Sequence, residues 1–266
     1  MVSKKSPLDM EWWQFRKKEQ KFLADREEKK DSILNRFLAE KVPEKLQGTL
    51  DTAFAKAFGV IFEKGTGVIE KTYRKEELQQ NFRINEYADE VRQTRKSLKV
   101  FEKKAGTAGT VNTLISGAAG IGMGAFGAGI PDIALVVGFI LRSIYEIALD
   151  YGYDYECEGE RRFILLLIEG AVSYGTELRA IDDAINTYIE NGEMPVDYEE
   201  KRQIERTAAG LSKELLYMKF LQGIPIVGVV GGAYDVVYMK KITEYANLKY
   251  KRRFLRKKKR EWVGKG

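Results

Sequence analysis

The amino-acid sequence predicts an all-α protein, and three observations support this fold class. Only five prolines interrupt the 266 residues, which leaves room for long helices. No segment alternates apolar and polar residues over a sustained length, as a half-buried strand does. Apolar residues instead recur with a period near 3.6, the period of an amphipathic helix. We therefore expect a multi-helix bundle in which two glycine-rich apolar helical units pack together.

The N-terminal hundred residues are expected to form charged amphipathic helices. Residues 8–39 carry apolar side chains at helical spacing among many charges, and they fit one or two helices. Pro43 then interrupts the pattern and suits the first turn of a second helix. Residues 71–104 are strongly charged, so we expect a mostly solvated helix or helix pair there.

The composition changes abruptly at residues 105–131, which contain no charged residue and eight glycines. Apolar helices are predicted to follow over residues 133–154 and 160–178, and a longer helix from Tyr198 to Leu221. Residues 223–255 repeat the earlier chemistry, with a glycine-rich apolar stretch, a proline near its start and then an amphipathic helix.

Four glycines are predicted to be helix-packing positions. Gly120 and Gly124 are four residues apart, as are Gly228 and Gly232, and this spacing of small residues lets two helices approach closely. A mid-helix glycine costs about 1 kcal/mol relative to alanine, so their density implies a compensating gain. Three interpretations stay open: a buried hairpin of a soluble core, an element that inserts conditionally into a bilayer, and a true transmembrane span. Charged residues soon after the first stretch weigh against spanning.

Missing residue types exclude several chemistries. The chain has no histidine, which excludes a His-based triad and any His-ligated metal site. Its single cysteine, Cys157, excludes an internal disulfide and a Cys-rich zinc site. The glycine-rich segment GIGMGAFGAG has neither the GK[ST] ending of a P-loop nor the preceding strand of a dinucleotide fingerprint. We expect no metal and no cofactor.

Positive charge is concentrated at the C-terminus. The whole chain carries +6, whereas residues 249–266 hold ten Lys/Arg and one Glu, so the preceding residues sum to −3. Basic side chains mixed with aromatic ones suit an anionic membrane surface. The residues expected to face such a surface are Arg252, Arg253, Arg256, Lys257, Lys258, Lys259, Arg260 and Trp262.

Two other interpretations of this segment stay open. It could be a solvated helix end, where basic residues are favourable near the negative pole of the helix dipole. The other is nucleic-acid binding, which is disfavoured and not expected, because the basic charge belongs to the tail and not to a face of the folded body. The N-terminal residues have no apolar run behind their lysines, so we expect no secretory signal and a cytoplasmic location, peripheral at the inner face of the membrane.

Carboxylates on apolar helices form the candidate functional cluster. Asp132 follows a proline and suits a helix start, and Glu146 lies nearly four turns later on nearly the same face. Arg142 precedes Glu146 by four residues, a spacing that permits an ion pair within the helix. The pattern fits either structural caps and pairs or a carboxylate site that binds a cation or a polar ligand. Asp235 is another acidic residue in apolar surroundings, where a polar contact within the bundle is expected.

Two motifs resemble the EcsC family of bacterial proteins. One is the PD…R…E…YG helix in GIPDIALVVGFILRSIYEIALDYGYD, and the other is the closing segment GIPIVGVVGGAYDVVYM. The resemblance covers roughly residues 40–256. Asp235 departs from the asparagine that family members often carry. The matching positions are Asp132, Arg142, Glu146, Tyr151 and Gly152 in the first motif and Gly228, Gly232 and Arg253 in the second.

The resemblance implies a mainly helical bacterial protein that is associated with membrane transport by genomic context, since the family is named after a member encoded beside an ABC transporter. It implies no particular reaction. We expect N-terminal amphipathic helices over residues 1–42, an EcsC-like helical domain over 43–248 and a basic tail over 249–266. The expected function is an accessory or regulatory role at the inner face of the cytoplasmic membrane. The alternative is an enzyme that uses Asp132 and Glu146 on a lipid-like or peptide substrate.

Overall fold

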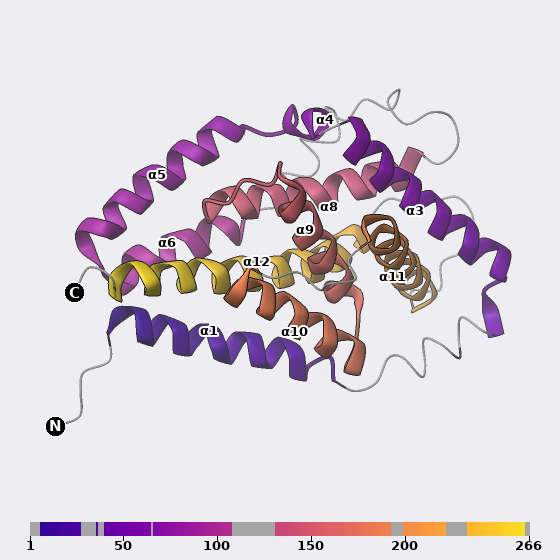
Figure 1. The fold of residues 1–266 in the computed structure, drawn as a ribbon. Coiled ribbons are helices and arrows are strands. Elements are labelled where there is room, and N and C mark those ends of the chain that lie inside the picture. Colours follow the sequence, from indigo (N-terminus) through magenta and orange to yellow (C-terminus); the bar gives the residue numbers. More distant parts are fainter. Residues whose placement is uncertain are drawn as a thin grey trace.

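The all-α prediction is confirmed: in a computed structural model, the described part of the chain is built of α-helices and contains no strand (Figure 1). The structure describes residues 6–27, 36, 40–64, 66–107, 131–192, 199–221 and 233–263. Its helices are α1 (Pro7–Ala24), α3 (Glu44–Lys64), α4 (Gly67–Glu70), α5 (Lys75–Arg92), α6 (Arg95–Ala105), α8 (Pro131–Asp150), α9 (Glu158–Val172), α10 (Gly175–Asn191), α11 (Glu200–Leu221) and α12 (Ala233–Val263).

Helix α12 crosses the middle of the molecule and organises the bundle (Figure 1). It packs against α8 and α9 and is flanked by α1 and α10. Its aromatic residues Tyr245, Tyr250 and Phe254 are fully buried, and the ring of Phe254 lies 4.5 Å from that of Phe101 on α6. Burial of such large side chains is the main favourable contribution to the core.

Local signals in the sequence explain where the N-terminal helices begin. The Ser6 side chain accepts a hydrogen bond from the Asp9 backbone N–H and so caps α1. Helix α3 begins directly after Pro43, as predicted. The charged segment 71–104 forms a helix pair, in which Thr94 and Ser97 make a capping box at the start of α6. This pair is less solvated than expected, because α6 buries one apolar face in the core.

Helices α8 and α12, which follow the two glycine-rich stretches in the chain, pack against each other. The four predicted helix-packing positions, Gly120, Gly124, Gly228 and Gly232, lie outside the described residues. Among the helices that are described, none is both long and apolar enough to cross a membrane.

The expected boundary at residue 43 falls directly before α3. Helix α1, assigned by sequence to a separate N-terminal segment, packs against α6 and α12. The boundary at residue 249 falls inside α12, which continues to Val263. Parts of the chain more than 200 residues apart therefore share one core.

Candidate functional site

The predicted carboxylate cluster contains a buried ion pair on α8. Nε of Arg142 lies 2.9 Å from Oε1 of Glu146, one turn further along the helix, and both side chains are buried. The spacing of four residues places the two groups on one helix face, as the sequence predicted. The side chains of Asp132 and Asp235 lie outside the described residues. A structural role therefore suffices to explain the Arg142–Glu146 pair, because each charge compensates the other.

Asp150, one turn after Glu146, is a buried carboxyl group with a perturbed pKa. Burial raises the pKa of its carboxyl group to about 7, Lys104 opposes this shift and the charge of Glu146 adds to it. A neutral, protonated Asp150 avoids placing a second negative charge beside Glu146.

The next two family-motif residues, Tyr151 and Gly152, connect α8 to its neighbours. The buried Tyr151 hydroxyl donates a hydrogen bond to Oδ1 of Asn247 on α12 over 2.7 Å. Gly152 has a φ of 79°, a region that favours glycine, and a Cβ there would overlap the ring of Phe82 on α5. These two positions are therefore explained by packing.

The basic segment expected as a tail is the second half of α12. Lys249 is completely buried, and its Nζ lies 2.8 Å from Oε1 of Glu19 on α1. The same nitrogen lies 2.5 Å from Oδ1 of Asp182 and 3.0 Å from Oδ1 of Asn186, both on α10. Because an ammonium group has three hydrogens, these acceptors can satisfy it fully. Lys249 thus joins three helices.

Two residues of the predicted membrane surface are also buried. Nη1 of Arg252 lies 2.8 Å from Oε2 of Glu19, so this carboxylate binds both Lys249 and Arg252. Lys258 is fully buried, and its Nζ lies 3.5 Å from Oδ2 of the equally buried Asp89 on α5. Neither Arg252 nor Lys258 presents a surface to lipid.

Three more of those residues are half-buried. Nη1 of Arg253 lies 2.7 Å from Oε2 of Glu160 on α9, and Nη2 of Arg256 lies 2.5 Å from Oε1 of Glu190 on α10. Trp262 packs against the core.

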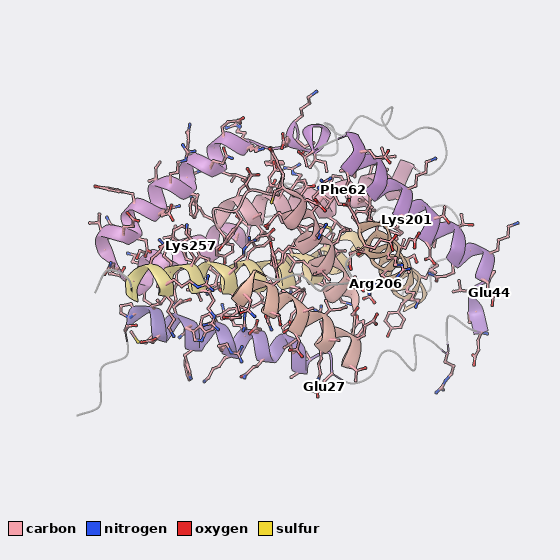
Figure 2. All side chains as sticks on the ribbon, in the orientation of Figure 1. Glu27, Glu44, Phe62, Lys201, Arg206 and Lys257 are labelled. Atoms are coloured by element: carbon pink, nitrogen blue, oxygen red, sulfur yellow. The ribbon has the colours of Figure 1, made fainter. Side chains whose placement is uncertain are left out.

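For residues 249–263, the expectation of a tail separate from the packed helices is thus corrected. The excess of +9 was summed along the chain, whereas the compensating acids lie on α1, α5, α6, α9 and α10. Acids distant in sequence thus pair with the cations between Lys249 and Lys258. Of the eight residues expected at a membrane surface, Lys257, Lys259 and Arg260 are exposed. Lys257 lies toward the end of the molecule where α12 finishes, far from Lys201 (Figure 2).

The same end of the molecule carries an exposed apolar stripe on α5. Ile84, Tyr87 and Val91 follow one another at helical spacing and are 67%, 71% and 68% exposed. We call these three residues the α5 stripe. Figure 1 shows that α5 finishes and α1 begins at the end where α12 finishes. Two further exposed apolar side chains, Met10 and Trp13, lie on the first turns of α1.

Basic side chains accompany the α5 stripe. Arg83 and Arg92 bracket it on α5, and Lys96 and Lys99 follow on α6; we call these four exposed residues the basic rim. Glu90 is an exposed acid on the same part of α5. An apolar stripe next to several cations is the surface chemistry of helices that lie in the interface of an anionic membrane. Sequence reasoning missed this stripe because it treated residues 71–104 as solvated; the spacing of 84, 87 and 91 was the available signal.

The described residues offer no obvious centre for metal chemistry. They contain no group of three or more Cys, Asp or Glu side chains that could hold a metal ion. Cys157 is exposed at the start of α9. Neither Arg142 nor Glu146 lines any of three pockets that the described parts of α1, α6 and α9–α12 form.

Comparison with known proteins agrees with the resemblance seen in the two sequence motifs. The model of the EcsC protein family matches residues 10–255, almost the whole of the 266-residue chain. No curated protein and no solved structure matches the chain significantly. The family match begins within α1 and ends within α12, so it extends over both boundaries expected from the sequence. The chain belongs to the EcsC protein family.

Proposed function

We propose that this protein is an accessory or regulatory component at the inner face of the bacterial cytoplasmic membrane, and that it docks peripherally on anionic lipid. The observation that carries the proposal is the α5 stripe with its basic rim. Exposed apolar side chains at helical spacing cost solvation free energy unless a partner covers them, and a neighbouring set of cations selects an anionic partner.

The expected binding energy is modest and suits reversible attachment. Transfer of the α5 stripe into the headgroup region contributes on the order of 4 kcal/mol. The four residues of the basic rim contribute about 1 kcal/mol each near an anionic surface. Together these contributions correspond to about micromolar affinity before the costs of association are subtracted. The folded protein would then bind the bilayer surface peripherally and reversibly.

Vesicle co-sedimentation tests the proposal. The intact protein should bind vesicles that contain phosphatidylglycerol and not vesicles of phosphatidylcholine alone, and added salt should weaken binding because it screens the charges. The pair Lys96→Gln and Lys99→Gln should weaken binding by about 2 kcal/mol, or about 30-fold, at low salt. Replacing Ile84 and Val91 by Gln should weaken binding at every salt concentration.

The matched control is Lys201→Gln, which removes an exposed charge at the start of α11, away from Lys257 (Figure 2). It should bind as the unchanged protein does. All these positions are exposed, so circular dichroism should show an intact fold in each variant. Equal binding to neutral and anionic vesicles, or full binding by the α5 stripe variant, would refute the docking surface. Binding of the stripe to a protein and not to lipid would also refute it.

The link to an ABC transporter rests on the family resemblance, and we include it in the proposal. Fractionation of cells should place the protein in the membrane fraction, from which a high-salt wash releases it. Deletion of the chain should change transport by its ABC transporter without removing the transporter from the membrane. The enzyme alternative gains no support from the described residues, because Glu146 is buried against Arg142.

A further inference from the structure

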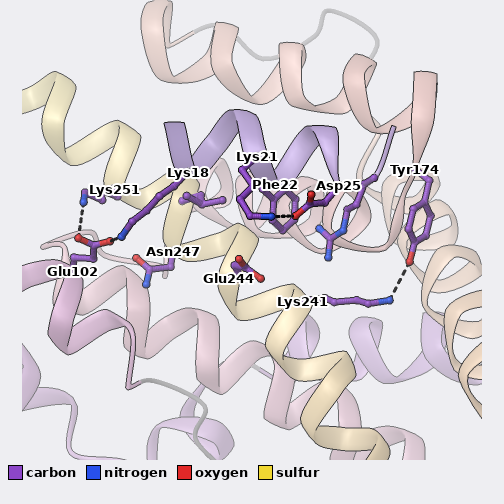
Figure 3. A pocket seen from close by; sticks show the side chains of 12 residues that line it. Lys18, Lys21, Phe22, Asp25, Glu102, Tyr174, Lys241, Glu244, Asn247 and Lys251 are labelled. Carbon is purple, nitrogen blue, oxygen red and sulfur yellow. Dashed lines mark hydrogen bonds and ion pairs between the residues drawn. The ribbon is translucent and has the colours of Figure 1, made fainter. Parts of the chain in front are cut away.

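A pocket of about 500 Å³ lies between α1 and α12, partly open to solvent. Figure 3 shows Tyr174 and Lys241 at one end and Glu102 and Lys251 at the other. Five of its twelve lining residues are lysine or arginine and three are carboxylates, an excess of two positive charges. Phe22 contributes an apolar surface to the lining.

Most of these cations already have a partner within the fold. Glu102 binds both Lys18 and Lys251, with Nζ–Oε distances of 2.5 and 2.7 Å. Lys21 binds Asp25 over 2.6 Å at the exposed rim. Lys241 pairs with the buried Glu214 and donates a hydrogen bond to the Tyr174 hydroxyl over 3.0 Å.

Arg26 differs from these lysines. It lies in the turn after α1, where its backbone oxygen accepts a hydrogen bond from the Gly175 N–H over 3.0 Å, so the turn is held against the start of α10. Its side chain is only 8% exposed, and its guanidinium lies 3.7 Å from the centre of the Phe22 ring. Nη1 has no hydrogen-bond partner, and none of the described carboxylates forms an ion pair with the group.

An arginine buried without an ion pair is unfavourable, because desolvation is not fully repaid. The charges of Glu244 and Glu214 act on Arg26 and repay only part of it, since burial is the larger effect. Burial lowers the pKa of Arg26, yet an arginine side chain stays protonated in proteins. Such a group is stabilised when a bound ligand supplies oxygen acceptors, and the planar guanidinium matches phosphate oxygens in pairs.

We propose that this pocket binds a ligand that carries a phosphate group, held by Arg26 and Lys241, with an apolar portion against Phe22. Glu214 and Glu11 pair with Lys241 and Lys251 from outside the lining and offset its two excess positive charges, so the charge that a phosphate would compensate is that of Arg26. Glu244 also lines the pocket; it is exposed and, within the described part of the chain, no ion pair neutralises it, so it opposes anion binding. The site is independent of the α5 stripe, since none of its residues belongs to α5.

Isothermal titration calorimetry with inorganic phosphate on the intact protein tests the proposal, with chloride at equal ionic strength as the reference. Arg26→Gln should weaken phosphate binding by about tenfold or more, because charge-assisted hydrogen bonds are lost. Glu244→Gln should tighten binding by about threefold, because a repulsive charge is removed. Lys17→Gln, exposed on α1 outside the pocket, should leave binding unchanged.

Arg26→Gln removes a positive charge from the pocket and Glu244→Gln removes a negative one, so their effects on phosphate binding should be opposite. The test stays decisive even if Arg26→Gln fails to fold, because Glu244 is exposed and its variant should fold normally. No binding of phosphate beyond chloride, or equal binding by the Arg26 and Glu244 variants, would overturn the proposal. Competition distinguishes the sources of the phosphate group. Displacement of phosphate by dihexanoyl phosphatidic acid at lower concentration than by glycerol phosphate identifies a lipid headgroup; the reverse order identifies a soluble phosphorylated compound.

Discussion

Lys249→Met tests whether buried ion pairs hold α12 in the bundle. The substitution keeps the length of the side chain but removes the ammonium group from between Glu19 and Asp182. At an effective dielectric constant of about 20, two unit charges 2.8 Å apart attract each other by about 6 kcal/mol. The desolvation of the ammonium group offsets much of this attraction, and the loss of one partner from a buried pair costs about 3–5 kcal/mol.

The lower part of that range is expected for Lys249. Glu19 keeps its contact with Arg252, and Asp182 keeps a 2.8 Å hydrogen bond from the Tyr245 hydroxyl. Neither carboxylate is therefore left without any compensating group. We expect the free energy of unfolding to fall by about 3 kcal/mol.

Urea unfolding followed by circular dichroism measures this change as a shift in midpoint at constant m. Lys259→Met is the matched control: it lies on the same helix and is exposed, so its effect should stay within about 0.5 kcal/mol. Adding Asp182→Asn to Lys249→Met should recover part of the loss, because one uncompensated charge disappears. A loss below about 1 kcal/mol for Lys249→Met, or a loss equal to that of Lys259→Met, would refute the argument that these pairs anchor α12.

Two further predictions concern α8 and the turn that follows it. Gly152→Ala should lower the free energy of unfolding by about 2–4 kcal/mol, because a Cβ would overlap Phe82 at a positive φ. In the control Gly48→Ala, the added Cβ meets nothing within 4 Å, so this variant should be slightly more stable than the unchanged protein. Equal melting temperatures for the two variants would contradict this account. The pKa of Asp150 is about 7 in the folded state, against an ordinary value of 3.8. Between these two values the folded protein retains a proton that the unfolded chain releases. The contribution of Asp150 to the free energy of unfolding should therefore decline as the pH rises from about 4 through 7. Asp150→Asn should flatten this decline, measured as the difference in melting temperature between pH 5 and pH 8; the same difference in both proteins would show that Asp150 does not cause it.

The fold class and several local features followed from the sequence because short-range physics determines them. Helical periodicity depends on the spacing of apolar residues, and the start of α3 depends on the fixed φ of Pro43. The pair Arg142–Glu146 was also predictable, since residues four apart in a helix are neighbours whatever the rest of the chain does.

The role of the basic segment was not predictable in the same way. Its charges were counted correctly, yet their partners lie elsewhere in the chain: Glu19 is 230 residues before Lys249. Ion pairs of this kind depend on which helix faces meet, and a local sum of charges carries no information about that. For the same reason, only the position of each residue around the helix could indicate from sequence that Lys258 is buried and Lys259 is exposed.

The sequence by itself therefore determined the helical class, the family motifs and the chemistries that a chain without histidine cannot perform. The tertiary structure decided which charges are free to meet a partner. It placed most cations of α12 against the acids of surrounding helices. Within the described residues, it left the α5 stripe exposed and Arg26 without an ion pair. The physical reason is that burial and pairing are properties of contacts between helices, whereas composition and periodicity are properties of one segment at a time.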